Sequence, residues 1–179
     1  MRIRALLASA ALSLTGLPAL AGVEAEALIA GTSVDISDPV RGQQAFSDSI
    51  DIPSVARFSL GKHARRVSEE DLERFTEAFH GYVNRTFEKH SDDFTNAQVD
   101  VLRSVDRSAT DSIVETRVTP TDGEVMTVRW RVVERGGEWR VVDVEVLGLW
   151  LAIEQRAQIA AIMDNPHATI DDAIAALGS

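Results

Sequence analysis

The stretch GEWRVVDVEVLGLWLAIEQRAQIAAI, residues 137–162, changes its hydrophobic period near its middle, and this change decides the fold class. The first part alternates apolar and polar residues, which predicts a strand over 138–147. From Leu149 onward the apolar residues take helical spacing, and Asn165 and Pro166 end the helix. A strand therefore runs into a helix with almost no loop between them.

Three further strands are expected before this stretch, at 97–105, 111–119 and 124–134. The sequences PTDG (120–123) and RGGE (135–138) have the chemistry of tight turns. The last three of the four strands should therefore form an antiparallel meander.

A long amphipathic helix is expected over 67–90, ahead of the strands. Ser68 is a favourable N-cap, and the acidic residues that follow favour the positive end of the helix. Phe75, Phe79 and Tyr82 fall on one apolar stripe. A long helix, four antiparallel strands and closing helices predict an α+β domain, with a four-stranded antiparallel sheet packed against helices.

The two ends of the chain carry weaker patterns. Residues 22–50 form a short N-terminal segment, in which we expect a turn over 35–39 and a helix before Gly31. At the other end, Thr169 can cap a last short helix over 170–177.

The hairpin that joins the last two strands has two candidate registers. A two-residue loop at Gly136 and Gly137 would pair Trp130 with Asp143, whereas a three-residue loop with a bulge shifts the pairing by one. We prefer the second, because one face then becomes apolar and the other carries cross-strand ion pairs. In that register the apolar face holds Val128, Trp130, Val132, Val142, Val144 and Val146, and the expected pairs are Arg131 with Asp143 and Arg129 with Glu145.

Composition and charge exclude several classes of function. Residues 1–21 have a positive start, an apolar run and a small-residue cleavage site, so we expect a signal peptide that is cleaved after Ala21. The apolar run is too short to span a bilayer. The chain has no cysteine and a formal charge of −10, and this acidity argues against a nucleic-acid partner.

Motifs for catalysis and metal binding are scarce. The four histidines lack ligand spacing, and no glycine-rich phosphate loop or G-x-S-x-G motif occurs. We therefore expect no catalytic residue and no bound metal. Tyr82 with Asp143 stays open as a buried acid–base pair, and the abundant apolar surface is either plain core or the lining of a ligand cavity.

Two separated blocks, residues 51–87 and 137–163, carry a distinctive set of residues. In the first block these are Asp51, Ala56, Arg57, Leu60, Gly61, Phe75, Phe79 and Tyr82, and in the second Trp139, Asp143, Gly148 and Arg156. In this order the set resembles the MlaC family, the toluene-tolerance or phospholipid-binding auxiliary proteins of an ABC transport system. Trp150 stands where that family usually has serine, and Gln155 where tyrosine is common.

The resemblance implies a periplasmic carrier that shuttles phospholipids between the outer and inner membranes and so supports outer-membrane lipid asymmetry. The implied partners are a phospholipid as cargo, an inner-membrane ABC transporter with an MCE-domain protein, and an outer-membrane lipoprotein complex. It also implies a lipid-binding domain over 51–179, a cone of the NTF2- or cystatin-like kind around an apolar cavity, with no cofactor and no enzyme activity. Two alternatives stay open: a small exported NTF2-like α+β enzyme with Asp143 as general base, and an adaptor that has lost the lipid cavity.

The lipid-binding residues that we expect share one apolar interior between the long helix, the last two strands and the final long helix. Arg156 is expected on the apolar side of that helix, opposite an arc formed by Glu154, Gln155 and Gln158. There it would either form a structural ion pair with a carboxylate or reach the lipid phosphate. The full expected set is Phe75, Phe79, Tyr82, Val128, Trp130, Val144, Val146, Trp150, Ile153 and Arg156.

Overall fold

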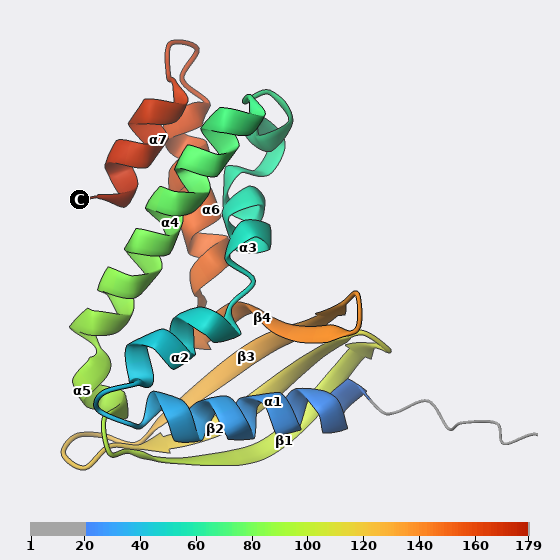
Figure 1. The fold of residues 1–179 in the computed structure, drawn as a ribbon, viewed down its shortest axis with the longest axis vertical. Helices are drawn as coiled ribbons and strands as arrows, with labels where there is room; N and C mark the ends of the chain where they lie inside the picture. Colours follow the sequence, from blue (N-terminus) through green and yellow to red (C-terminus); the bar gives the residue numbers. More distant parts are fainter. Residues whose placement is uncertain (1–20, 179) are drawn as a thin grey trace, which may run out of the picture.

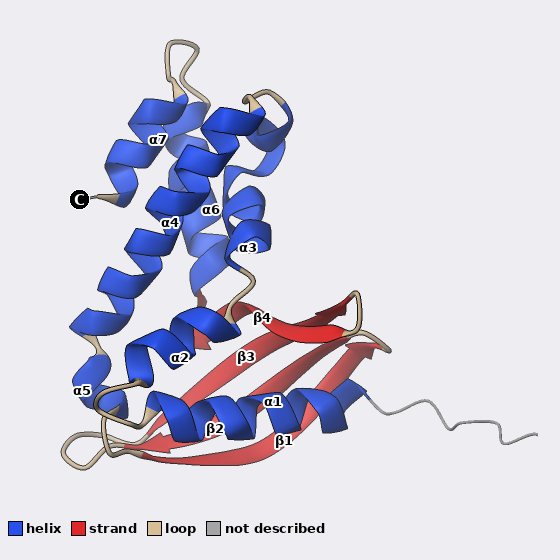
Figure 2. Cartoon of the chain, in the orientation of Figure 1, coloured by secondary structure: helices blue, strands red, loops and turns tan. Residues whose placement is uncertain are grey.

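The computed structural model describes residues 21–178, so the predicted signal peptide at 1–21 lies outside the described residues except for Ala21. A sheet carries helices on one face, and a layer of helices stands beside it (Figures 1 and 2). The helices are α1 (Ala21–Ile36), α2 (Gly42–Ser49), α3 (Ile52–Leu60), the 3-10 helix η1 (Gly61–Arg65), α4 (Glu69–Lys89), α5 (Ser91–Phe94), α6 (Leu151–Met163) and α7 (Ile170–Leu177). The strands are β1 (Gln98–Ser108), β2 (Asp111–Thr119), β3 (Met126–Arg135), β4 (Glu138–Val146) and β5 (Leu149–Trp150).

Two helices, α1 and α2, occupy the segment that the sequence left largely unassigned, and both lie over the sheet (Figure 1). The expected helix continues through Gly31 to Ile36, and the turn follows at 37–41 rather than at 35–39. An added Cβ at Gly31 would meet no atom within 4 Å. This glycine therefore faces open space, where it lowers helix propensity without ending the helix.

The sheet is antiparallel with the strand order β1-β2-β3-β4-β5, which confirms the α+β class and adds a fifth strand to the four expected. β5 has only two residues, and these pair with the end of β4. Farther along the same edge of β4, Ile50 forms a parallel bridge with Val141. These short pairings protect an edge whose N–H and C=O groups would otherwise lack partners.

The hairpin between β3 and β4 combines both candidate registers. Its loop is the two-residue one, since Arg135 pairs with Glu138 across Gly136 and Gly137, whose φ angles are 62° and 88°. A bulge at Val142 then shifts the ladder by one residue. Beyond it the pairs are those of the preferred register: Arg131 with Asp143, Trp130 with Val144, Arg129 with Glu145 and Val128 with Val146.

The bulge corrects the expected apolar face. Val132 pairs with Val141, so Val141 joins the face of Trp130 and Val144 and is fully buried there. Val142, which we expected on that face, is half-buried and packs against the helical layer instead. The three-residue loop was wrong because an extra residue can be inserted inside the strand as well as at the turn.

One of the two expected ion pairs on the outer face is confirmed. Arg129 contacts Glu145 at 2.9 Å. Arg131 lies opposite Asp143 in the ladder, but its guanidinium binds Asp111 of β2, with Nη2 2.8 Å from Oδ2. The predicted Arg131–Asp143 ion pair is therefore wrong, because Asp143 turns inward beside the bulge and is only 7% exposed.

The inner face of the sheet and the helices α1 and α2 form a first apolar core, the sheet core. At its centre the indole nitrogen of Trp130 donates to Thr116 Oγ1 at 2.9 Å, and that hydroxyl donates to the carbonyl of Val128 at 3.1 Å. Phe46 of α2 stacks on Phe87 at the end of α4, with ring centroids 4.7 Å apart. The buried members of this core are Ala25, Ile29, Ile36, Phe87, Ala97, Val114, Val118, Val128, Trp130, Val132, Val141 and Val144.

The helices α3, α4, α6 and α7 form a second apolar core, the helical core. The caps predicted for two of them are confirmed: Ser68 accepts a hydrogen bond from the first turn of α4, and Thr169 forms a capping box with Asp172 at the start of α7. The buried members are Val55, Ala56, Leu60, Ala64, Phe75, Phe79, Ala152, Ile159, Ile170, Ala173 and Leu177.

Gly81, inside α4, makes room for a contact that ties α4 to α7. A Cβ added at Gly81 would lie 3.2 Å from Nη1 of Arg85. The other terminal nitrogen of Arg85 donates to the carbonyl of Leu177 at 2.7 Å, at the end of α7. The cost of a glycine within the helix is thus offset by satisfaction of a C-terminal carbonyl.

Candidate functional site

An apolar pocket lies at the seam between the sheet core and the helical core. The bulged part of β4, one face of α4 and the first turns of α6 form its walls, and residues of α2 and α3 close it. Its volume is about 90 Å³. The lining residues are Phe46, Ile50, Val55, Phe79, Tyr82, Val83, Thr86, Val141, Val142, Asp143, Val144, Leu151, Ala152 and Gln155.

Asp143 holds the β4 wall against the α6 wall. Its Oδ1 accepts hydrogen bonds from the backbone N–H of Val144 at 2.9 Å and of Ala152 at 2.8 Å. Ala152 lies in the first turn of α6, whose N-cap residue Trp150 provides no side-chain cap. A carboxyl from a neighbouring strand therefore takes over the capping of this helix.

Burial raises the pKa of the Asp143 carboxyl above its ordinary value. The backbone hydrogen bonds from Ala152 and Val144, and the charge of Arg131, oppose this rise without cancelling it. Tyr82 lines the same pocket, but no hydrogen bond joins it to Asp143 in the part of the chain that the structure describes. The Asp143 carboxyl therefore positions α6, and it does not form the acid–base pair with Tyr82 that the sequence left open.

The inward face of α6 differs from the one expected. Ala152, Gln155 and Ile159 are buried, and Gln155 is only 4% exposed although the sequence placed it on the outer arc. The helix carries apolar residues almost all round, so its sequence does not select one inward face. Packing against the neighbouring elements selects the buried face, while the hydrogen bond from Ala152 to Asp143 anchors the start of the helix.

Arg156 consequently points outward, so the prediction that it lies on the buried side of α6 is wrong. Its guanidinium stacks on the ring of Phe58 in α3, 4.8 Å from the ring centroid. It also lies over Gly61, where an added Cβ would be 3.2 Å from Nε. No ion pair of Arg156 is found within residues 21–178. Gly61 has a φ of 57°, so a side chain there would be both crowded and strained.

The expected lining residues do not share one interior, and this part of the prediction is wrong. Phe79, Tyr82 and Val144 line the pocket, Phe75 is buried in the helical core, Val128 and Trp130 are buried in the sheet core, and Val146 packs half-buried against the sheet core. The error arises because the sequence shows that the sheet and the long helix each have an apolar face. It does not show that the sheet packs mainly on α1 and α2 while α4 packs on α3, α6 and α7.

Two further expected residues lie near the surface. Trp150 is half-buried, and the guanidinium of Arg129 lies 5.6 Å from the centroid of its ring. Ile153 is 50% exposed, on the face of α6 opposite Gln155. Neither lines the apolar pocket, because the observed rotation of α6 directs Leu151 and Gln155 there instead.

Several pocket residues were not predicted. Thr86 lies on the same stripe of α4 as Tyr82, and Val83 lies beside it, so the helical spacing could have indicated both. Phe46 and Ile50 come from α2 and the linker after it. That short helix carries no apolar repeat long enough to identify it from sequence.

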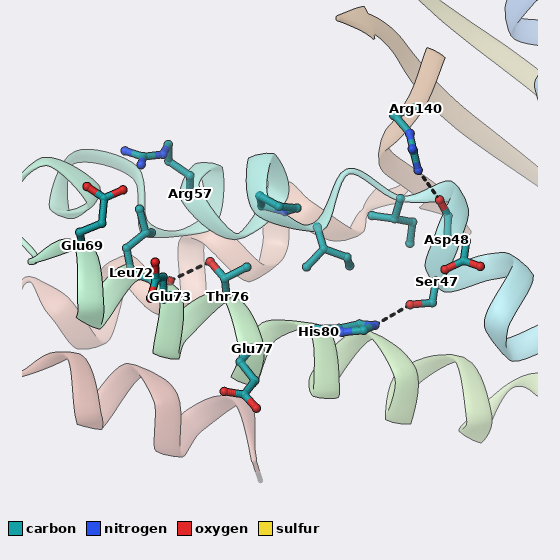
Figure 3. A pocket seen from close by; sticks show the side chains of 13 residues that line it. Ser47, Asp48, Arg57, Glu69, Leu72, Glu73, Thr76, Glu77, His80 and Arg140 are labelled. Atoms are coloured by element: carbon teal, nitrogen blue, oxygen red, sulfur yellow. Dashed lines mark hydrogen bonds between the residues drawn. The ribbon is translucent and has the colours of Figure 1, made fainter. Parts of the chain in front are cut away.

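A second hollow, of about 960 Å³, lies between α4 and the segment of α2 and α3 (Figure 3). Glu69, Glu73 and Glu77 occupy successive turns of α4 along it, and Arg57 and Arg140 also line it. We call it the polar groove. Ile52, Pro53 and Leu72 add apolar surface to its lining, but the exposed charged groups must stay hydrated, so the groove is a poorer match for acyl chains than the apolar pocket.

The polar groove and the apolar pocket are neighbours. Ile50 is the residue that lines both. On the groove side, Ser47 Oγ lies 2.6 Å from Nε2 of His80 (Figure 3). Within residues 21–178 no carboxylate contacts the other ring nitrogen of His80, so this pair lacks the third group of a catalytic triad.

Residues 21–178 hold neither a metal-binding cluster nor a membrane-spanning helix. No group of three or more histidine, aspartate or glutamate side chains comes together there in a way that could hold a metal ion. None of the described helices combines the length and the apolar character needed to cross a bilayer.

The fold and the pocket define an α+β protein whose sheet and helical layer meet at an apolar cavity. The model of the MlaC protein family matches residues 40–179, and the chain therefore belongs to the MlaC family. A solved structure with a similar fold is that of the phospholipid-binding protein from Ralstonia solanacearum in complex with a phospholipid. The two chains are 18% identical with a TM-score of 0.73, over 89% of this chain and 96% of that one. None of the curated proteins matches the chain.

Proposed function

We propose that this protein is a phospholipid carrier that holds acyl chains in the apolar pocket between its two cores. The observation that carries the proposal is the position of that pocket, which is lined by apolar side chains from both cores of an MlaC-family chain. The similar fold of a protein that is described as phospholipid-binding and in complex with a phospholipid supports it.

The energetics explain why a carrier is useful. Each buried methylene contributes about 0.8 kcal/mol, and two acyl chains contain roughly thirty, so leaving them in water costs on the order of 20 kcal/mol. A protein that covers the chains removes this barrier without any chemical step. The head group, which water solvates well, can remain outside.

The pocket must widen to accept such a ligand. Its volume of about 90 Å³ lies well below the roughly 300–1,000 Å³ of small-molecule sites. Ile50 lines both this pocket and the polar groove of about 960 Å³. We place the widening at this seam, since moving Ile50 with the linker between α2 and α3 would enlarge the pocket while leaving each core packed.

The setting of the carrier follows from the family and from the expected signal peptide. We propose that the mature chain begins after Ala21 and works in the periplasm. Its partners there would be an inner-membrane ABC transporter with an MCE-domain protein and an outer-membrane lipoprotein complex, between which it shuttles phospholipids. Cell fractionation with N-terminal sequencing tests the location, and a full-length cytoplasmic product would contradict it.

Native mass spectrometry of the protein purified from cells tests the binding proposal. The wild-type protein should carry phospholipid. Val83→Asp, and separately Val144→Asp, should remove it, because both positions line the pocket. Val105→Asp is the matched control, since Val105 is 53% exposed on β1 and lies away from the pocket.

Circular dichroism melts show whether each variant is folded. A folded Val83→Asp protein with a full lipid load would contradict the assigned pocket. Wild-type protein that never carries or takes up phospholipid would contradict the carrier function and favour an adaptor.

A further inference from the structure

Gln155 is the most deeply buried of three pocket side chains, with Tyr82 and Thr86, whose polar atoms form no hydrogen bond within residues 21–178. It is 4% exposed and lines the pocket from the inward face of α6. Its side-chain amide forms no hydrogen bond within residues 21–178, and its polar atoms are not among those sealed from solvent without a partner. Water in the pocket can therefore satisfy this amide, and a ligand group that replaces the water must offer it a hydrogen bond.

The depth of Gln155 fits the polar end of an acyl chain. Leu151 lines the same pocket one helical turn earlier and is 43% exposed, so it marks the rim. Gln155 follows about 6 Å farther along the helix, at 1.5 Å per residue, and is covered. A lipid whose chains fill the pocket and whose head group stays outside would bring its ester groups near this level.

The other polar group of the wall restricts the chemistry of the ligand. Asp143 already acts as an acceptor, with Oδ1 bound to two backbone N–H groups. A ligand carboxylate would place a second anion against this carboxyl. A neutral carbonyl brings an acceptor without a charge, and the amide of Gln155 can donate to it.

We propose that Gln155 donates a hydrogen bond to an acyl ester carbonyl of the bound lipid, so that the pocket favours ester-linked over ether-linked phospholipids. This inference rests on the proposed carrier function. It makes Gln155 a specificity-determining residue of an otherwise apolar pocket. Apolar walls cannot tell an ester from an ether, but a buried donor can.

The test compares two lipids that differ only in the carbonyl. Delipidated protein is incubated with vesicles of diester phosphatidylethanolamine or of the diether analogue with the same chain lengths, and bound lipid is counted by native mass spectrometry. Wild-type protein should load the ester about five- to tenfold better, the effect of one neutral hydrogen bond. In Gln155→Leu this preference should fall to about one, with diether loading maintained.

Gln158→Leu is the matched control, because Gln158 is exposed on the same helix. It should keep the wild-type preference. Equal loading of ester and ether by wild-type protein, or an unchanged preference in Gln155→Leu, would overturn the inference while leaving the carrier function intact. Failure of wild-type protein to load either lipid would contradict the carrier function itself, and the inference with it. If Gln155→Leu does not fold, Gln155→Met serves, because it also removes the donor at similar volume.

Discussion

The two cores of this protein treat their polar groups differently. At the centre of the sheet core the buried polar atoms are matched, since Trp130 donates to Thr116 and Thr116 donates to a backbone carbonyl, whereas Ser33 Oγ on the buried face of α1 has no partner within residues 21–178. At the border of the helical core, the amide of Gln155 faces the pocket with no protein hydrogen bond within residues 21–178, and burial raises the pKa of Asp143. The comparison teaches that the centre of the sheet core satisfies its polar groups internally, while the seam beside it keeps polar groups that a ligand could use.

Trp130→Ala should have the largest effect of these variants, and it tests the sheet core. It empties the centre of the sheet core and leaves Thr116 without its donor, so we expect a loss of about 3–5 kcal/mol in the free energy of unfolding. Urea denaturation measures it. A loss below about 1 kcal/mol would contradict the central position of Trp130 in the sheet core.

Asp143→Ala should have the next largest effect, because it removes the acceptor of two backbone N–H groups at the seam. Leaving such buried donors unpaired costs about 1–3 kcal/mol. Asp143→Asn keeps an oxygen in place and should lose less. Equal losses in the two variants would show that the hydrogen bonds to Val144 and Ala152 are not what holds β4 to α6.

The pH dependence of stability tests the same carboxyl. Because burial raises the pKa of Asp143 in the folded protein above the ordinary value of 3.8, the folded state binds the proton more tightly than the unfolded state. The stability that Asp143 contributes is therefore largest at acid pH and falls as the pH rises from about 3.8 through the raised folded value. The unfolding free energy of wild type relative to Asp143→Asn should decline over that window. A rise instead would show that the pKa is lowered on folding.

Arg156→Ala should have only a small effect. Stacking on Phe58 at the surface of the helical core is worth about 0.5–1 kcal/mol. A loss of 3–5 kcal/mol, the cost of breaking a buried ion pair, would contradict the exposed position of Arg156. The other hypothesis, that Arg156 contacts the lipid phosphate, is tested by the lipid load of the purified variant. A normal load would contradict it.

The smallest effect is expected on the outer face of the sheet. Arg129 and Glu145 form a partly exposed cross-strand pair, for which a double-mutant cycle should give a coupling of about 0.2–1 kcal/mol. The cycle uses Arg129→Gln, Glu145→Gln and the double variant in urea denaturation at low and high salt. Coupling that does not weaken with salt would show that the pair is less hydrated than its exposure indicates.

Features that depend on nearby residues could be predicted from the sequence. Ser68 and Thr169 cap helices through bonds within one turn, and the alternation of β3 and β4 selects the pairing of Trp130 with Val144. The bulge could not be located, because Val141 and Val142 are equally apolar and either can face the sheet core.

The site was less predictable than the fold because tertiary contacts decide it. The rotation of α6 depends on its packing against other elements, which its nearly uniform apolar pattern does not show, and it places Gln155 rather than Arg156 at the pocket. The sequence identified the apolar surfaces that meet at Phe79 and Val144. It could not show that the surfaces form two cores with a seam between them.

Photo-cross-linking tests the central claim, that acyl chains lie in the seam between the two cores, most directly. The purified protein is loaded with phosphatidylethanolamine that carries a diazirine near the end of one acyl chain, irradiated and mapped by peptide mass spectrometry. We predict cross-links to residues 79–86 of α4, 141–144 of β4 and 151–155 of α6. Cross-links confined to the polar groove along Glu69, Glu73 and Glu77, or to the outer face of the sheet, would contradict the claim.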